Sequence, residues 1–129
     1  MIEFPIESDR LILRSFCSND AEQLFDYLSK PEIYQYEPGE PITLDEAERL
    51  CSERSEGDGF VAVCLKEHNQ LIGHLSFHRA EPAYVNTYEL GYIFNPSYQH
   101  KGYCTEAVKT LVSNAMATGQ IHRIEARCD

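Results

Sequence analysis

The segment from Tyr88 to Val108 constrains the fold of this chain more than any other. Apolar residues alternate with other residues along 84–94, which predicts a strand that ends at an Asn-Pro pair. A short loop then leads to Gly102, and apolar residues recur at helical spacing over 103–118. This order predicts a crossover connection, so the next expected strand, 121–128, runs parallel to the first.

The rest of the chain supplies the other elements of one domain, 1–129. We expect strands over 10–16, 60–65 and 71–78, a helix after Ser18-Asn19-Asp20, and a second helix opened by a Thr43–Glu46 capping box. The predicted class is α/β (α+β), a mixed and mostly antiparallel sheet flanked by helices. In the strand over 71–78, one face is expected to carry Leu71, Gly73, Leu75 and Phe77, and the other Ile72, His74, Ser76 and His78.

Net charge and cysteine content limit the classes of partner and the compartment that we expect for this protein. The net charge of -10, from 21 acidic and 11 basic residues, argues against nucleic acid as a partner and is compatible with a cationic one such as an amine. The five cysteines form no C-x-x-C pair, so we expect neither a disulfide framework nor a metal site. No apolar run is long enough for a bilayer. We therefore expect a soluble protein of the cytoplasm.

The loop before the helix over 103–118 has the chemistry of an anion site. N–H groups in the first turn of a helix have no partner within the helix, and the helix dipole favours negative charge there. Gly102 allows the backbone to approach a phosphate closely, and His100 and Lys101 add possible positive charge. The loop therefore predicts a phosphate-bearing ligand.

The same loop resembles a known cofactor motif. Gln99-His100-Lys101-Gly102-Tyr103-Cys104 is similar to the Q/R-x-x-G-x-G/A motif of the GNAT superfamily of N-acetyltransferases, with cysteine at the sixth position. The RimJ/RimL-like branch matches more widely, and the residues that carry this match are Glu89 to Tyr92, Asn95-Pro96, Gln99 to Ala107, the R-L-I-L-R run at 10–14 and the H-R-I-E-A-R run at 122–127.

This resemblance implies a GNAT-like acyl-CoA N-acyltransferase fold and acetyl-CoA as cosubstrate, without a metal. The backbone of Tyr92, Ile93 and Phe94 is expected to bind the pantetheine arm. The pyrophosphate is expected on the backbone of Gln99, His100, Lys101, Gly102, Tyr103 and Cys104, with Thr105. The implied reaction is direct attack of a primary amine, on a protein N-terminus or a small molecule, without an acetyl-enzyme. Cys104 is therefore interpreted as a packing residue rather than a nucleophile.

Catalytic and acceptor residues are predicted less directly. Glu89 is the candidate general base, because it matches the glutamate of the branch and lies beside the cofactor strand; it could equally anchor the substrate ammonium or pair with a neighbouring strand. Tyr34 and Tyr36 are candidate substrate contacts or packing aromatics. His74 and His78 could line a substrate groove, although an exposed sheet face is the favoured interpretation.

The resemblance also implies further elements beyond Asp129, so we expect a domain truncated after the fifth predicted strand. Three outcomes stay open: a second copy covers the last strand as a homodimer, the chain is a fragment, or the product is naturally short and weakly active or inactive. Two alternatives to an active N-acetyltransferase follow. One is a CoA-binding module without turnover, and the other is a domain that binds another phosphate ligand.

Overall fold

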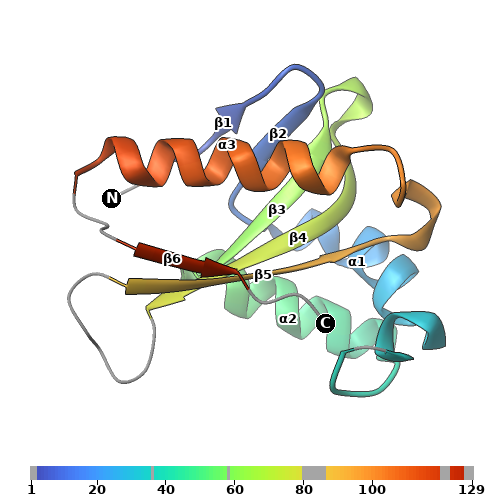
Figure 1. Cartoon of the computed structure of the whole chain (residues 1–129). Coiled ribbons are helices and arrows are strands. Elements are labelled where there is room, and N and C mark those ends of the chain that lie inside the picture. The colour runs from blue at the N-terminus through green and yellow to red at the C-terminus, as the bar shows by residue number, and fades with distance from the viewer. Residues whose placement is uncertain (1–2, 36, 58, 80–86, 120–122, 127–129) are drawn as a thin grey trace.

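A single mixed sheet organises the part of the chain that the structure describes (Figure 1). The computed structural model describes every residue except 1–2, 36, 58, 80–86, 120–122 and 127–129. The described strands lie in chain order across the sheet and pair antiparallel, except for the last two, which pair parallel. They are β1 (Ile6–Glu7), β2 (Leu11–Arg14), β3 (Phe60–Leu65), β4 (Gln70–Arg79), β5 (Thr87–Phe94) and β6 (Arg123–Ala126). The predicted mixed, mostly antiparallel sheet is confirmed.

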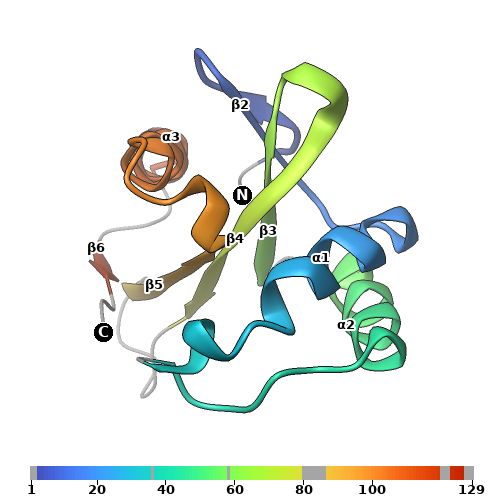
Figure 2. The same cartoon turned by 90° about the vertical axis from the view of Figure 1, so that its right-hand side faces the viewer.

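Helices cover both faces of this sheet (Figure 2). Helix α3 (Tyr103–Ala117) packs on one face, and α1 (Ala21–Leu28) and α2 (Leu44–Glu56) pack on the other. Short 3-10 segments connect these elements: η1 (Ser18–Asp20), η2 (Pro31–Gln35), η3 (Glu67–Asn69) and η4 (Pro96–Tyr98). The crossover from β5 through α3 to the parallel strand β6 is the connection that the sequence predicts.

The two faces of the sheet bury two separate apolar clusters. On the α3 face, Leu111 and Ala115 pack against strand residues such as Leu13, Leu75 and Leu90, and all five are fully buried. On the other face, the cluster combines α1, α2 and η2 with the opposite sides of β3 and β4. Burial of apolar surface on both faces holds the helices in place, because each Å² removed from water stabilises the fold by about 25 cal/mol.

Helix α2 begins where the capping box predicts. The Thr43 side chain accepts a hydrogen bond from the Glu46 N–H at 3.2 Å, and the Glu46 carboxylate accepts one from the Thr43 N–H at 3.0 Å. Ala47 and Cys51 on this helix are buried, whereas Leu44, in its first turn and outside the buried cluster, is 40% exposed.

The predicted face pattern of β4 is wrong at its start. The register between β3 and β4 shifts after Val63, which pairs with Gly73, because Cys64 pairs with Leu71. Ile72 is therefore the extra residue of a β-bulge, and the alternation reverses there. As a result Ile72 lies in the α3-side cluster, whereas Leu71 lies in the cluster under α1 and α2.

His74 does not lie on an exposed sheet face, contrary to the favoured interpretation. Helices α1 and α2 cover this face of β4, and His74 is 3% exposed. Its Nδ1 atom lies 2.6 Å from the Tyr27 hydroxyl. His78, near the other end of the strand, is exposed as expected. The sequence alternation shows which residues share a face, but not which face a helix covers.

Three further findings concern strand β1, membrane-spanning helices and the cysteines. Strand β1 was not predicted, because two residues next to Pro5 carry no alternation to detect. Among the described residues, no helix is long and apolar enough to cross a membrane. The described cysteines are free thiols, and burial raises the pKa of Cys51 and Cys64 to about 11.

Candidate active site

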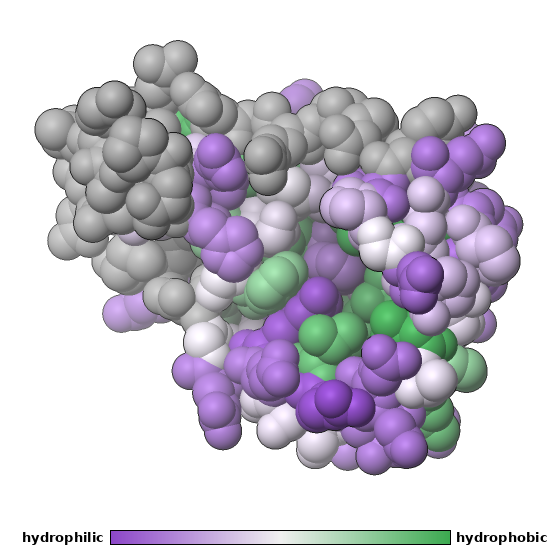
Figure 3. Space-filling model, turned by 90° about the horizontal axis from the view of Figure 1, so that it is seen from below, coloured by the Kyte–Doolittle hydropathy of each residue, from purple (hydrophilic) through white to green (hydrophobic). Residues whose placement is uncertain are grey.

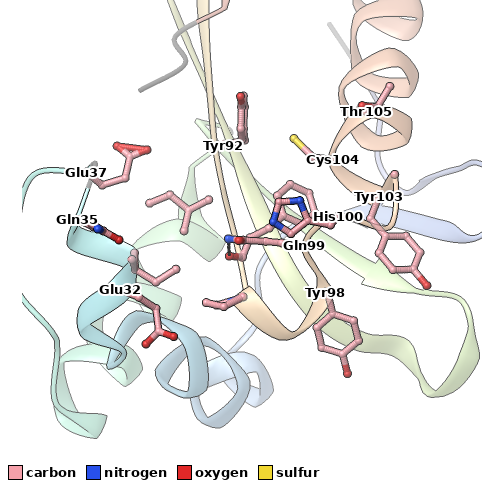
Figure 4. Close-up of a pocket in the computed structure, with 15 residues that line it drawn as sticks. Glu32, Gln35, Glu37, Tyr92, Tyr98, Gln99, His100, Tyr103, Cys104 and Thr105 are labelled. Carbon is pink, nitrogen blue, oxygen red and sulfur yellow. Dashed lines mark hydrogen bonds between the residues drawn. The ribbon is translucent and has the colours of Figure 1, made fainter.

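A cavity of about 590 Å³ opens where β5 ends and α3 begins, a size typical of small-molecule sites. Three segments line it: the η2 segment together with Glu37, the end of β5, and the loop into α3 with the first turn of that helix. Figure 4 shows Glu32, Gln35 and Glu37 on one wall and Cys104 and Thr105 on the other, with Tyr92 between them. The lining residues are Glu32, Ile33, Gln35, Glu37, Tyr92, Ile93, Phe94, Pro96, Tyr98, Gln99, His100, Gly102, Tyr103, Cys104 and Thr105.

The end of β5 has an open edge in the described part of the chain. Strand β4 pairs with β5 as far as Phe94, but β6 pairs with it only over 87–90. The Asn95 N–H donates to the Ile72 carbonyl at 2.8 Å, so odd-numbered residues of β5 face β4. By this alternation Tyr92 and Phe94 direct their backbone groups to the open edge, and the backbone of Ile93 faces β4. Ile93 reaches the cavity with its side chain.

The loop from η4 to α3 lines the cavity with Gln99, His100 and Gly102. His100 and Gly102 both have left-handed backbone, with φ of 64° and 81°. Gly102 is the N-cap of α3 and has no side chain that could accept a hydrogen bond from the first turn. The first-turn N–H groups of α3 and its dipole are suited to an anion, and anion binding at this loop stays a prediction.

Gln99 has a second role that the motif does not reveal. Its side-chain amide donates a hydrogen bond of 3.0 Å to the Phe94 carbonyl, so it ties the loop back onto the end of β5. Lys101 is not among the lining residues; its ammonium lies 5.8 Å from the centre of the Tyr98 ring. Any contact between Lys101 and a ligand at this loop therefore remains a prediction.

Asn95, which we expected only to end the strand, anchors this end of β5. It is 1% exposed, its side-chain amide donates to Asp26 at 2.8 Å, and its side-chain oxygen accepts from the Ser97 N–H at 3.0 Å. The strand end is thus bound to α1 on one side and to η4 on the other. The sequence signal was the Asn-Pro pair, which marks a turn but not its tertiary partner.

The predicted acceptor and base residues lie differently from the cofactor residues. The Tyr34 hydroxyl donates to the Leu28 carbonyl at 2.8 Å, and burial raises the Tyr34 pKa, so this side chain packs against α1. Its sequence neighbours Ile33 and Gln35 line the cavity, whereas Tyr34 does not. Tyr36 lies outside the described residues. Glu89 is half-buried and lies opposite His78 in the register of β4 and β5. It is not among the lining residues.

The distance of Glu89 from the cavity follows from strand geometry. Glu89 shares its face with Ile93, four residues further along β5, which corresponds to about 13 Å. Its role as a base therefore stays a prediction. Sequence reasoning missed the two carboxylates that do line the cavity, Glu32 and Glu37, because the η2 segment has no periodic pattern.

Figure 3 shows the molecule from below, the side on which α2 lies. Hydrophilic side chains surround a hollow in which hydrophobic side chains are visible. Among the residues that the structure describes, no three His, Cys, Asp or Glu side chains form a group that could hold a metal ion.

A mixed sheet in which two parallel strands pair only in part, beside a helix that begins at a left-handed glycine, is typical of the N-acyltransferase class. The family model described as acetyltransferase (GNAT) domain matches residues 10–129, and the chain belongs to this family. The predicted fold and family are confirmed, and the chain is an acetyl-CoA-dependent acetyltransferase.

Known relatives agree with this assignment. The uncharacterized N-acetyltransferase YnaD of Bacillus subtilis (strain 168) is 32% identical over 125 residues, which are 95% of this chain and 72% of that protein. The crystal structure of a GNAT-family acetyltransferase from Bacillus anthracis has a TM-score of 0.88 at 30% identity, and the match covers 97% of this chain and 74% of that one.

The RimJ/RimL-like resemblance is also confirmed. The ribosomal-protein-serine acetyltransferase of Escherichia coli (strain K12) is 25% identical over 129 residues, which are 94% of this chain and 71% of that protein.

Proposed function

We propose that this chain transfers the acetyl group of acetyl-CoA to a primary amine by direct attack, with both substrates bound at once in the cavity at the end of β5. The observation that carries the proposal is the meeting of the open β5 edge and the N-terminus of α3 in a single cavity. The open edge of β5 is suited to an extended chain that contains amide groups, and the N-terminus of α3 is suited to an anion.

The residues present fit acetyl-CoA. Its pantetheine arm contains amide groups, and Tyr92 offers a backbone donor and acceptor at the open edge. Its pyrophosphate suits the backbone of residues 99–104 and Thr105, where Gly102 adopts the left-handed backbone of the turn into α3. Bound there, acetyl-CoA supplies a reactive thioester. We assign the Phe94 N–H to stabilising the negative charge that develops on the thioester oxygen.

The opposite wall suits the amine. Glu32 and Glu37 line it, and negative carboxylates favour an ammonium group by Coulomb attraction. An ammonium has to lose a proton before it can attack, and an α-amine with a pKa of about 7.7–8.0 needs only a modest base. Glu89 remains our candidate, acting through water because of its distance. A Glu89→Gln variant with the pH–rate profile of the parent would eliminate it.

The first test is calorimetric titration of acetyl-CoA into the chain, supported by a thermal melt. Saturating ligand at a hundred times Kd is expected to stabilise the fold by about 2.7 kcal/mol. A screen of primary amines, from short basic peptides to small molecules, then measures release of the CoA thiol. Absence of binding to the folded chain contradicts the proposal. Binding without turnover for any amine favours the CoA-binding module instead.

A further inference from the structure

Arg10, at the other end of the chain, supports the loop before α3 from outside the cavity. Its Nε donates a hydrogen bond of 2.7 Å to Glu106 in the first turn of α3, and its Nη1 donates one of 3.1 Å to the Lys101 carbonyl. Its guanidinium lies 4.3 Å from the centre of the Tyr103 ring. One side chain thus contacts residues on both sides of Gly102, and it is not among the residues that line the cavity.

Glu106 brings a negative charge close to the anion site. Burial raises the pKa of its carboxyl, but hydrogen bonds from the Ser8 hydroxyl, the Arg10 N–H and the Arg10 side chain outweigh this and lower it. Glu106 is therefore ionised at neutral pH. A carboxylate there stabilises the helix, but it also repels any phosphate bound at the same helix N-terminus. Arg10 compensates this charge.

We propose that Arg10 is a positioning residue for acetyl-CoA. It holds the Lys101 carbonyl and the Tyr103 ring in place, and it neutralises Glu106, so that the first turn of α3 meets the pyrophosphate without a competing negative charge. This inference rests on the proposed function, because it assumes that acetyl-CoA binds at this loop.

The chain offers a matched control four residues further along, at the end of β2. Arg14 forms a two-point ion pair with Asp20, with N–O distances of 2.9 and 2.7 Å. Its other hydrogen bonds go to Ser15 and Asn69, which do not line the cavity. Loss of the Arg14 pair is therefore a structural loss that leaves the cofactor loop untouched.

The test is calorimetric titration of acetyl-CoA into the parent chain and into Arg10→Gln, Arg14→Gln and Arg10→Gln/Glu106→Gln variants. Arg10→Gln is expected to raise Kd about tenfold, and Arg14→Gln to lower the melting temperature without changing Kd. The double variant is expected to recover most of the affinity, because it removes the uncompensated carboxylate. A purely structural contact predicts no such recovery. Should Arg10→Gln fail to fold, Arg10→Lys keeps the charge and is expected to bind more weakly than the parent.

The outcomes separate the two proposals. If the parent binds acetyl-CoA and Arg10→Gln (or Arg10→Lys, where it replaces it) binds equally well, Arg10 is not a positioning residue. If the single and double variants lose affinity equally, charge compensation is wrong and the proposal is overturned. If the folded parent does not bind acetyl-CoA, it is the proposed function that fails, and this inference fails with it.

Discussion

The two faces of the sheet use polar groups in different ways. Under α1 and α2, the buried polar side chains are paired: Asp20 with Arg14, His74 with Tyr27, and Asn95 with Asp26. On the α3 face, the buried cluster is apolar, and the polar groups gather at the N-terminus of the helix, beside the cavity. One face therefore uses its polar groups to hold the fold together, whereas the other leaves them available to a ligand.

Arg54 is the exception on the α1 and α2 face. Its Nε and Nη1 atoms are buried without a hydrogen-bond partner among the described residues. Its guanidinium lies 4.0 Å from the centre of the Phe60 ring and 5.3 Å from that of Phe16. Desolvation lowers the Arg54 pKa, and the two aromatic faces supply part of the compensation that a carboxylate would give.

The largest expected effect concerns the α3 face, where Gly102 precedes the helix N-terminus. Gly102→Val places a branched side chain at φ 81°, which costs about 1–2 kcal/mol, and its Cβ would lie 3.4 Å from the Arg10 guanidinium that supports this loop. We expect Kd for acetyl-CoA to rise by about 100-fold or more, measured by calorimetry. Gly119→Val is the control, because Gly119 also has a left-handed φ (73°), but no described residue lies within 4 Å of the position of an added Cβ. Normal binding by Gly102→Val would show that the loop is not the site.

The second prediction concerns the paired face. Asp20→Asn leaves Arg14 without its counter-charge, and since Arg14 is only 17% exposed, we expect unfolding to become easier by about 2 kcal/mol. Chemical denaturation measures this loss, with Glu48→Gln, at an exposed position on α2, as the control. Affinity for acetyl-CoA is expected to stay the same. A weakened affinity in the folded variant would mean that the two faces are not independent.

The pH dependence of this pair has a definite sign. Burial raises the pKa of Asp20, but the hydrogen bonds from Arg14 and the Cys17 N–H lower it below its ordinary value. A carboxyl group with a lowered pKa in the folded state stabilises above its unfolded pKa, and this contribution disappears as the pH falls through the folded value. The difference between parent and Asp20→Asn should therefore shrink in acid, below about pH 4.

Local signals in the sequence predicted much of the fold. The Thr43 capping box, the apolar run over 60–65 and the loop-to-helix change at Gly102 each depend on neighbouring residues, and the structure has the expected elements at all three. Contacts between distant segments escaped prediction. The pairing of Arg10 with Glu106 spans 96 residues, and the covering of His74 depends on how α1 packs. No periodicity encodes either of these contacts.

The candidate site divides in the same way. The anion loop was predictable because a glycine next to a helix N-terminus is a short-range pattern. The opposite wall was not, since Glu32 and Glu37 become part of the cavity only when η2 folds back against the end of β5. Ile72 illustrates the same limit within a strand, because the bulge that reverses its face is set by pairing with β3.

The smallest expected effect tests whether the buried pair under α1 is neutral. Burial, and then the charge of Arg54, hold the pKa of His74 well below its ordinary value of about 6.5, and burial raises the pKa of Tyr27, so the hydroxyl donates to an uncharged ring. Below pH 6.5 the unfolded chain binds a proton at His74 that the folded chain does not bind, so stability falls as the pH falls.

Between pH 6.5 and 5.5, the parent is expected to lose about 1 kcal/mol more of its unfolding free energy than His74→Gln, measured by denaturant unfolding at each pH. His78→Gln, at an exposed position, is expected to follow the parent. Parallel curves for the parent and His74→Gln would mean that His74 titrates freely in the folded chain, and that this face of the sheet is less closed than its contacts indicate.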